Sequence, residues 1–118
     1  MLRFFKSFGY AILGLRYGFK TQLNFRVHCI ALIAVLILGC CTGLNANEWL
    51  WICMASGLVI VTELINTALE VLVDLVSPQY HVKAGIIKDL AAGAVLVAAI
   101  TAVVIGLLIF IPKFCHAT

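Results

Sequence analysis

Residues 63–74 read ELINTALEVLVD, and they continue an apolar run that begins at Trp49. At about 100° of rotation per residue, the polar side chains of this segment share one stripe of a helix. They are Glu63, Asn66, Thr67, Glu70 and Asp74. Ionisable groups at membrane depth usually face a bundle interior or a watery cavity. The stripe is therefore a candidate functional site; the structural alternative is a polar contact between helices or a solvated helix end.

The composition around this stripe is that of an integral membrane protein. Of the 118 residues, 64% are hydrophobic and only 11% are charged, whereas about a quarter are charged in an ordinary soluble domain. We expect an all-α integral membrane protein with one small domain, residues 1–118. A monomer of this size has little interior in which to bury a polar stripe, so assembly with further copies of the chain is also expected.

The basic residues are unevenly distributed. The formal net charge is +3, and five of the eight Lys and Arg residues come before residue 27. A basic segment beside apolar helices indicates an anionic membrane surface, and it gives no reason to expect a nucleic-acid partner. The five cysteines are odd in number and none has the CxxC spacing, so the sequence supports neither a disulfide framework nor a zinc site.

Hydropathy divides the chain into a surface segment and three spans. Residues 1–26 place basic and aromatic side chains on different faces, which predicts an amphipathic helix on the cytoplasmic leaflet, with a break possible at one of its glycines. This segment lacks the continuous apolar core of a signal peptide. The predicted transmembrane helices are residues 27–44, 49–76 and 90–111. Even the shortest of them reaches about 27 Å, enough for the hydrocarbon core of a bilayer.

Local signals indicate where these helices end. Asn47 is the predicted N-cap of the second span, and Ser77-Pro78 is its predicted end. Residues 77–89 are expected to form a polar loop, and Pro112 to end the third span. Lys and Arg are absent from residues 45–48 but frequent in the N-terminal segment and the 77–89 loop. The positive-inside rule therefore places the N-terminus and that loop in the cytoplasm.

The polar groups favour metal-assisted phosphoryl transfer at a membrane surface. No Walker A loop, GxGxxG, HExxH or GxSxG motif occurs in the chain. Glu70 and Asp74 supply the oxygen donors that Mg²⁺ prefers, and Lys88 supplies a cation for a phosphate. Glu63, held deeper and drier, could act as a general base on a lipid hydroxyl. The alternative for Glu63 is a carboxylic acid that hydrogen-bonds to a neighbouring helix.

These residues resemble the prokaryotic diacylglycerol kinase family, which includes the undecaprenol kinases. The likeness lies in Glu63-x-x-Asn66-Thr67-x-x-Glu70-x-x-x-Asp74, Pro78-Gln79-Tyr80-His81 and Lys88-Asp89, and it extends over nearly the whole chain. The resemblance implies a homotrimer in the bacterial cytoplasmic (inner) membrane, with a surface helix and three spans per subunit and active sites between subunits. It also implies transfer of the γ-phosphate of Mg·ATP to a membrane lipid alcohol, either diacylglycerol or undecaprenol.

The resemblance assigns roles to individual residues. Glu63 is then the catalytic base, and Glu70 is a ligand of the nucleotide-bound Mg²⁺. The residues implied around the nucleotide are Arg3, Tyr10, Asn66, Asp74, Gln79, Tyr80, His81, Lys88 and Asp89, while Arg16 and Arg26 are implied near the lipid entrance. Many members have a glutamate as a second metal ligand where this chain has Gln22. A glutamine can offer a carbonyl oxygen there but no negative charge.

Two other functions stay open at this point. Gln22 motivates a catalytically impaired scaffold or pseudo-kinase of the same fold. The acidic stripe motivates a small oligomeric transporter or channel, although only Ser56 and Thr62 continue it up the helix. His28 sits at the membrane edge, where a hydrogen-bonding structural role is expected. The pattern Asn24-x-Arg26-x-His28 resembles the undecaprenol-kinase branch more than the enteric diacylglycerol-kinase branch.

Overall fold

The structure is a computed structural model that describes residues 1–116. Over this part of the chain it has four helices and no strand: α1 (Leu2–Thr21), α2 (Leu23–Thr42), α3 (Ala46–Val76) and α4 (Val82–His116). Among these described helices, α2, α3 and α4 are long and apolar enough to cross a membrane. The all-α class and the three potential spans are as predicted from the sequence.

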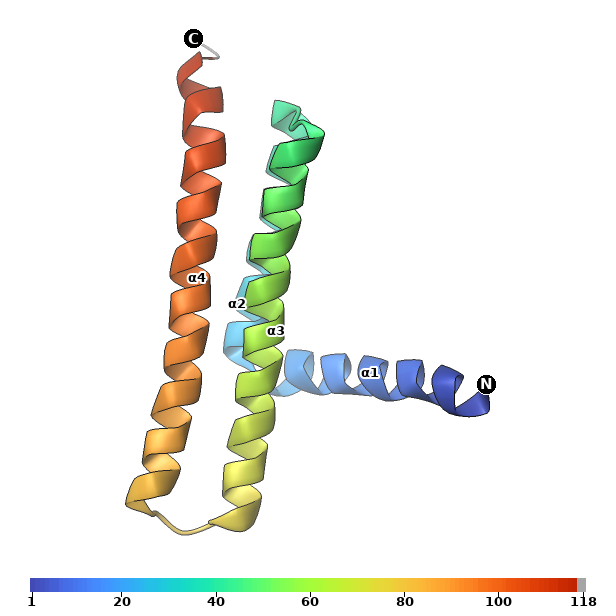
Figure 1. The fold of residues 1–118 in the computed structure, drawn as a ribbon, viewed down its shortest axis with the longest axis vertical. Coiled ribbons are helices and arrows are strands. Elements are labelled where there is room, and N and C mark those ends of the chain that lie inside the picture. Colours follow the sequence, from blue (N-terminus) through green and yellow to red (C-terminus); the bar gives the residue numbers. More distant parts are fainter. Residues whose placement is uncertain (117–118) are drawn as a thin grey trace.

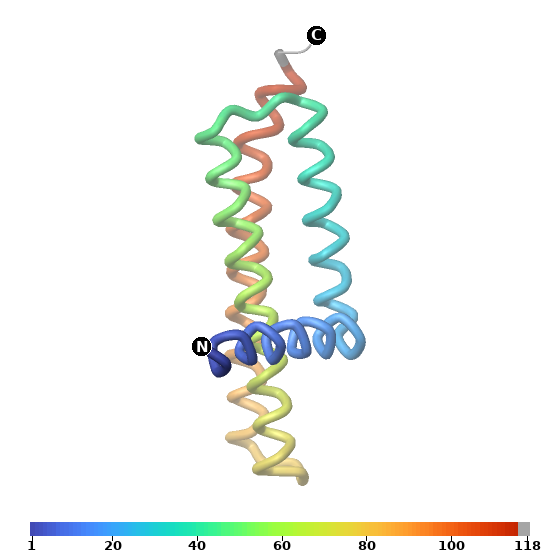
Figure 2. Tube along the Cα trace, turned by 90° about the vertical axis from the view of Figure 1, so that its right-hand side faces the viewer, coloured from blue at the N-terminus to red at the C-terminus, as the bar shows by residue number. Residues whose placement is uncertain are grey.

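The helix that carries the polar stripe lies in the middle of the bundle. α3 packs against both α2 and α4, and α1 runs out sideways from the other three helices (Figure 1). The hairpin of α3 and α4 extends well past the level of α1 (Figure 2). Ala91 and Ala98 are buried on α4, and small side chains of this kind let membrane helices approach closely.

The predicted surface segment 1–26 is divided at Gln22. Its glycines do not break it: α1 is continuous to Thr21, and Gln22 then adopts an extended conformation before α2 begins at Leu23. The guanidinium of Arg26 donates to the carbonyl oxygens of Phe19 and Lys20 at 3.4 and 3.3 Å. A cation at the C-terminus of a helix stabilises its unpaired carbonyls. α2 begins at Leu23, four residues before the start of the predicted span 27–44, and it ends at Thr42.

The turn between α2 and α3 is closed by a glycine and a capping box. Gly43 has φ 71°, in the left-handed region that glycine adopts without strain at a helix end. The predicted N-cap Asn47 is wrong, because Asn45 caps α3 instead. Asn45 Oδ1 accepts from the Glu48 amide at 2.9 Å, and Glu48 Oε1 accepts from the Asn45 amide at 3.0 Å. This reciprocal pair satisfies two unpaired amides at once.

The connection between α3 and α4 is shorter than the predicted loop 77–89. α3 ends at Val76, as expected ahead of Ser77-Pro78, but α4 already begins at Val82. His81 Nδ1 accepts from the Lys83 amide at 3.0 Å and so caps the new helix. Lys88 and Asp89 therefore lie on a helix rather than in a loop.

The predicted end of the third span at Pro112 is also wrong, because α4 continues through this proline to His116. Near a helix end a proline removes a single backbone donor. One residue later, Lys113 Nζ lies 3.0 Å from Glu48 Oε1. This ion pair joins the last turns of α4 to the first turn of α3.

Candidate active site

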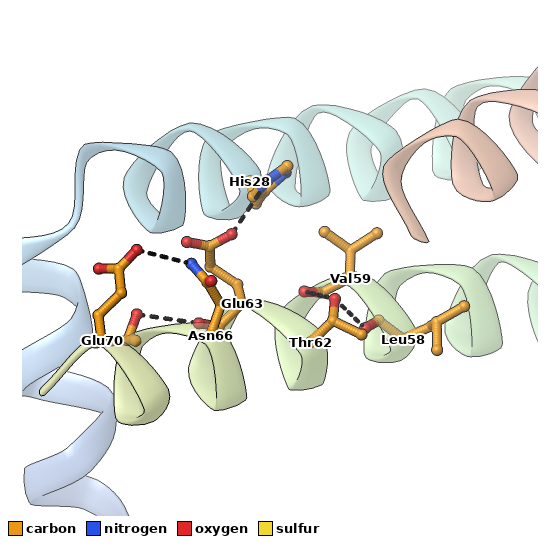
Figure 3. Close-up of polar contacts among 8 residues, drawn as sticks. His28, Leu58, Val59, Thr62, Glu63, Asn66 and Glu70 are labelled. Carbon is orange, nitrogen blue, oxygen red and sulfur yellow. Dashed lines mark hydrogen bonds and ion pairs between the residues drawn. The ribbon is translucent and has the colours of Figure 1, made fainter. Parts of the chain in front are cut away.

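The end of the polar stripe that begins at Glu63 faces the interior of the helix bundle. Glu63, Asn66 and Thr67 are 1%, 6% and 5% exposed, and Glu63 points from α3 toward α2 (Figure 3). Thr67 Oγ1 donates to the main-chain carbonyl of Glu63 at 3.0 Å. The shared helical face predicted for these residues is therefore present, and it is directed inward.

The Glu63 carboxylate is buried without a hydrogen bond. Neither of its oxygens has a hydrogen-bond partner in the part of the chain that the structure describes. The nearest polar atom recorded is His28 Nε2 on α2, 3.8 Å from Oε2. Leaving a buried polar group unpaired costs about 1–3 kcal/mol, and more for a charged one.

Asn66 connects Glu63 to the next acidic residue. It lies one turn along α3, and its Nδ2 donates to Glu70 Oε1 at 3.3 Å. The Asn66 Oδ1 atom is buried and has no partner among the described residues. This bond orients the Glu70 carboxylate and leaves its second oxygen available. Within the described residues, no neighbouring helix supplies a hydrogen bond to Glu63 or to Asn66 Oδ1.

The lower end of the stripe is completed from α4. Lys88 Nζ lies 2.7 Å from Asp74 Oδ1, so the lysine is held on the same side of the hairpin as the acidic residues of α3. Both side chains are solvent-exposed, and an exposed ion pair of this kind contributes only about 0–1 kcal/mol. Its importance therefore lies in placing a cation beside the stripe rather than in stability.

The other predicted residues are not brought to this stripe within one chain. Arg3 and Tyr10 are exposed on α1, whose N-terminal end lies away from the bundle (Figure 1). The Gln79–His81 segment forms the exposed far end of the α3–α4 hairpin. Asp89 follows Lys88 on α4 and is exposed. Their roles at the nucleotide stay predictions.

Metal ligands are sparse along the stripe. Within residues 1–116, no three His, Cys, Asp or Glu side chains come together as a metal site. Gln22 lies at the junction of α1 and α2, where its recorded hydrogen bonds involve only its main chain. Mg²⁺ is commonly held by one or two carboxylates together with substrate phosphates. The free oxygen of Glu70 fits that kind of site, whereas a fully protein-made cage is not supported.

The proximity of His28 to Glu63 was not predicted from the sequence. The two residues lie on different helices, so no pattern within one helix connects them. Their distances along the helices from the α2–α3 turn connect them approximately: His28 is 14 residues before the end of α2 at Thr42, and Glu63 is 17 residues after the start of α3 at Ala46, a difference of less than one turn. Helices of equal rise then bring both side chains to nearly the same level of the hairpin.

The fold and this polar stripe define a class: a multi-pass membrane protein with a buried carboxylate inside its helix bundle. The sequence profile of the prokaryotic diacylglycerol kinase family matches residues 9–110. The chain belongs to this family, and the resemblance drawn from the sequence motifs is confirmed. The matched range includes Tyr10 but not Arg3.

Named relatives agree with this assignment. An undecaprenol kinase from Bacillus subtilis is 46% identical over 111 residues, which are 94% of this chain and 90% of the relative. A diacylglycerol kinase from Synechocystis sp. is 47% identical over 107 residues, covering 90% of this chain and 61% of the relative. A diacylglycerol kinase from Escherichia coli is 31% identical over 102 residues, 86% of this chain and 84% of the relative. Family membership favours an enzyme, a kinase, over a transporter or a scaffold.

Proposed function

We propose that this chain transfers the γ-phosphate of Mg·ATP to the hydroxyl of a membrane lipid alcohol at the cytoplasmic membrane face. The observation that carries the proposal is the buried Glu63 carboxylate, which has no hydrogen-bond partner among the described residues. Below it, on the same helix, Asn66, Glu70 and Asp74 lead toward the end of the hairpin. A base deep in the bundle and charged groups below it are what a lipid acceptor and a nucleotide donor require.

The position of α1 supports this division of the site. Gly18 of α1 packs against α3: a Cβ placed on it would lie 3.5 Å from Leu64 Cδ2. With the basic α1 flat on the cytoplasmic leaflet, Leu64 lies at the boundary of the membrane and Glu63 at the edge of the hydrocarbon. Glu70 is then about 10 Å and Asp74 about 16 Å further toward water. The basic residues of α1 and of the α3–α4 connection support the cytoplasmic orientation.

The chemistry follows from the position of each group. Glu63 takes the proton of the lipid hydroxyl as its oxygen attacks the γ-phosphorus. The bond between that phosphorus and the β–γ bridging oxygen breaks, and ADP leaves with its electron pair. Glu63 then carries the proton and releases it to water, which restores the base. Lys88 offsets charge on the phosphates, and Asp74 holds the lysine in place.

A magnesium ion, when bound with the nucleotide, supplies charge neutralisation on the phosphates. Glu70 would hold it through the oxygen that Asn66 does not occupy. Gln22 would offer an amide oxygen where many relatives offer a carboxylate. Oxygen ligands of this kind suit Mg²⁺, with phosphate oxygens and water as the remaining ligands.

We further propose a homotrimer with the nucleotide site between subunits. Arg3 and Tyr10 lie on α1, which leaves its own bundle. Among the described residues, no recorded ion pair joins α1 to the stripe on α3. Large apolar side chains remain exposed along α2 and α4. Contact between subunits would cover part of this surface and bring α1 of one chain to the site of another.

For the acceptor we propose undecaprenol, with diacylglycerol as the second candidate. The Asn24-x-Arg26-x-His28 pattern and the Bacillus subtilis undecaprenol kinase, of which this chain covers 90%, favour the first. The Synechocystis diacylglycerol kinase, equally similar in sequence, is the reason to retain the second.

The test is transfer of labelled γ-phosphate from ATP in mixed micelles, with each lipid offered separately. We expect transfer by the wild type and none by Glu63→Gln. The matched control is Glu48→Gln, at the other end of α3, which keeps a side chain able to complete the capping box and should remain active. Wild-type protein that is folded but transfers phosphate to neither lipid would refute the proposed function.

A further inference from the structure

His28 is the one polar side chain from a neighbouring helix that is recorded close to the Glu63 carboxylate, within the residues that the structure describes. Its Nε2 lies 3.8 Å from Oε2, and 22% of the imidazole is exposed. Figure 3 shows the ring on α2 directed at the carboxylate on α3. The contact is too long for a hydrogen bond, but a shift of about 1 Å would make it one.

The neighbours of Glu63 on its own helix are engaged elsewhere. The Thr67 hydroxyl donates to the main-chain carbonyl of Glu63 rather than to its carboxylate. The Asn66 amide donates to Glu70. No donor on α3 is therefore recorded on the carboxylate, so a hydrogen bond that fixed the orientation of Glu63 would have to come from outside α3.

The surroundings above Glu63 offer no replacement for the imidazole. His28 lines a cavity of about 420 Å³ between α2, α3 and α4, where the other lining side chains are apolar except for Ser56. Ser56 lies seven residues from Glu63 on the same helix, about 10 Å along its axis. A hydrogen bond to the carboxylate from this side can come only from His28 among the cavity's described lining residues.

We propose that His28 is a positioning residue for the lipid kinase reaction, and this inference rests on the proposed function. The imidazole Nε2–H donates to Glu63 Oε2 when the site closes around its substrates. That bond holds the carboxylate in one orientation and leaves Oε1 to accept the proton of the lipid hydroxyl. Catalytic hydrogen bonds are often long in the absence of substrate and shorten in the reactive complex, so 3.8 Å suits such a contact.

A positioning histidine and a purely structural histidine differ in which measured quantity changes when the residue is replaced, and for a positioning residue that quantity is the reaction rate. A misplacement of a catalytic group by 1 Å can lower the rate by about 100-fold. We therefore expect His28→Leu to lower kcat by about 10- to 100-fold with little change in the KM for ATP, whose site lies further along α3. His28→Gln carries an amide N–H close to the place of Nε2, so it should restore most of kcat.

The contact itself is measurable without activity. The three histidines of the chain, including His28, can be labelled with ¹⁵N on the imidazole in detergent-solubilised protein, and His28→Leu identifies the signal. We expect the Nε2 signal of His28 to move in Glu63→Gln and to stay unchanged in the control Glu48→Gln. The second variant changes the same type of residue on the same helix, away from the site.

The outcomes separate the two proposals. Active wild-type protein together with fully active His28→Leu would overturn the positioning role and leave the proposed function standing. A His28 signal that stays unchanged in Glu63→Gln when Mg·ADP and the lipid acceptor are added to both samples would overturn it as well, whatever the variants do in the assay. Wild-type protein without transfer to either lipid would remove the proposed function, and the positioning role with it. A loss of kcat that His28→Gln rescues, with the expected shift, supports both.

Discussion

Replacing Glu63 with methionine should stabilise the fold and abolish phosphate transfer. Both carboxylate oxygens are buried without a hydrogen bond in the described part of the chain, and the side chain is 1% exposed. Such an unsatisfied group costs about 1–3 kcal/mol, and more if it is charged. Methionine is unbranched, of similar length and free of strongly polar atoms. We therefore expect the free energy of unfolding of Glu63→Met to rise by about 1–3 kcal/mol.

The same substitution at the other end of α3 is expected to have the opposite sign. Glu48 is bonded to the Asn45 amide in a capping box and lies 3.0 Å from Lys113 Nζ. Glu48→Met removes both contacts, which together are worth about 1 kcal/mol. The two variants make the same chemical change on one helix, at a carboxylate without a recorded hydrogen bond (Glu63) and at a hydrogen-bonded carboxylate (Glu48).

Both variants should be compared with the wild type by denaturant titration in one detergent, followed by helix content. The protein concentration must be equal in all three samples, because assembly makes the measured stability depend on it. Kinase activity is measured on the same samples. A fall of more than about 1 kcal/mol in Glu63→Met would refute the reasoning. It would mean that the carboxylate is satisfied within the fold and is held there for structure.

Three further predictions follow from single contacts. Gln22→Glu adds a negative charge to the proposed metal site and should lower the Mg²⁺ concentration at half-maximal rate severalfold, measured by titrating Mg²⁺ at saturating ATP; an unchanged requirement would remove residue 22 from the site. Lys88→Met should raise the KM for ATP about tenfold without unfolding the protein, since its exposed bond to Asp74 contributes at most about 1 kcal/mol to stability. Lys83→Met is the control, and an equal rise in KM in the two variants would contradict the role of Lys88 at the phosphates. Gly39→Ala should lower the free energy of unfolding by about 1–3 kcal/mol, because its Cβ would lie 2.6 Å from Trp49 Cη2. The Cβ of Gly57→Ala meets no atom within 4 Å, so this variant should be neutral or stabilising when both are compared by the same denaturant titration.

The helices themselves were predictable because their signals are local. Apolar length predicted three possible spans, and Ser77-Pro78 correctly marked the end of α3. The errors lie at ends fixed by particular side chains. Asn45-x-x-Glu48 is a capping box that could have been read from the sequence in preference to Asn47. By contrast, the start of α4 depends on the His81 ring turning back to the Lys83 amide, which spacing alone does not reveal.

The end of α4 shows a further limit of local reading. Pro112 is a strong stop signal when a helix is considered alone. Here the next residue, Lys113, forms an ion pair with Glu48, which lies in the first turn of α3. Glu48 is more than sixty residues away from Lys113 in the sequence. The sequence around Pro112 therefore gave no sign of a contact that would oppose its stop signal.

The candidate site was predictable where one helix supplies it and missed where two helices meet. Glu63, Asn66 and Glu70 share a face of α3 by periodicity alone; Glu63 and Asn66 are buried on that face, and Asn66 donates to Glu70. The contact of His28 with Glu63 needs the register of α2 against α3. That register is set at the turn, by the left-handed Gly43 and the Asn45 cap.

From such a turn, residues at equal distances along two helices reach equal depth. His28 and Glu63 meet that condition to within one helical turn, 14 residues before the end of α2 and 17 residues after the start of α3. Counting outward from a well-defined turn therefore finds pairs that periodicity within one helix cannot. It also shows why the register of α2 matters to the site: one residue inserted into α2 between His28 and the turn would move His28 about 1.5 Å along the helix and turn it by about 100° away from Glu63. The capping box on the far side of the bundle thus helps to determine which side chain faces the buried carboxylate.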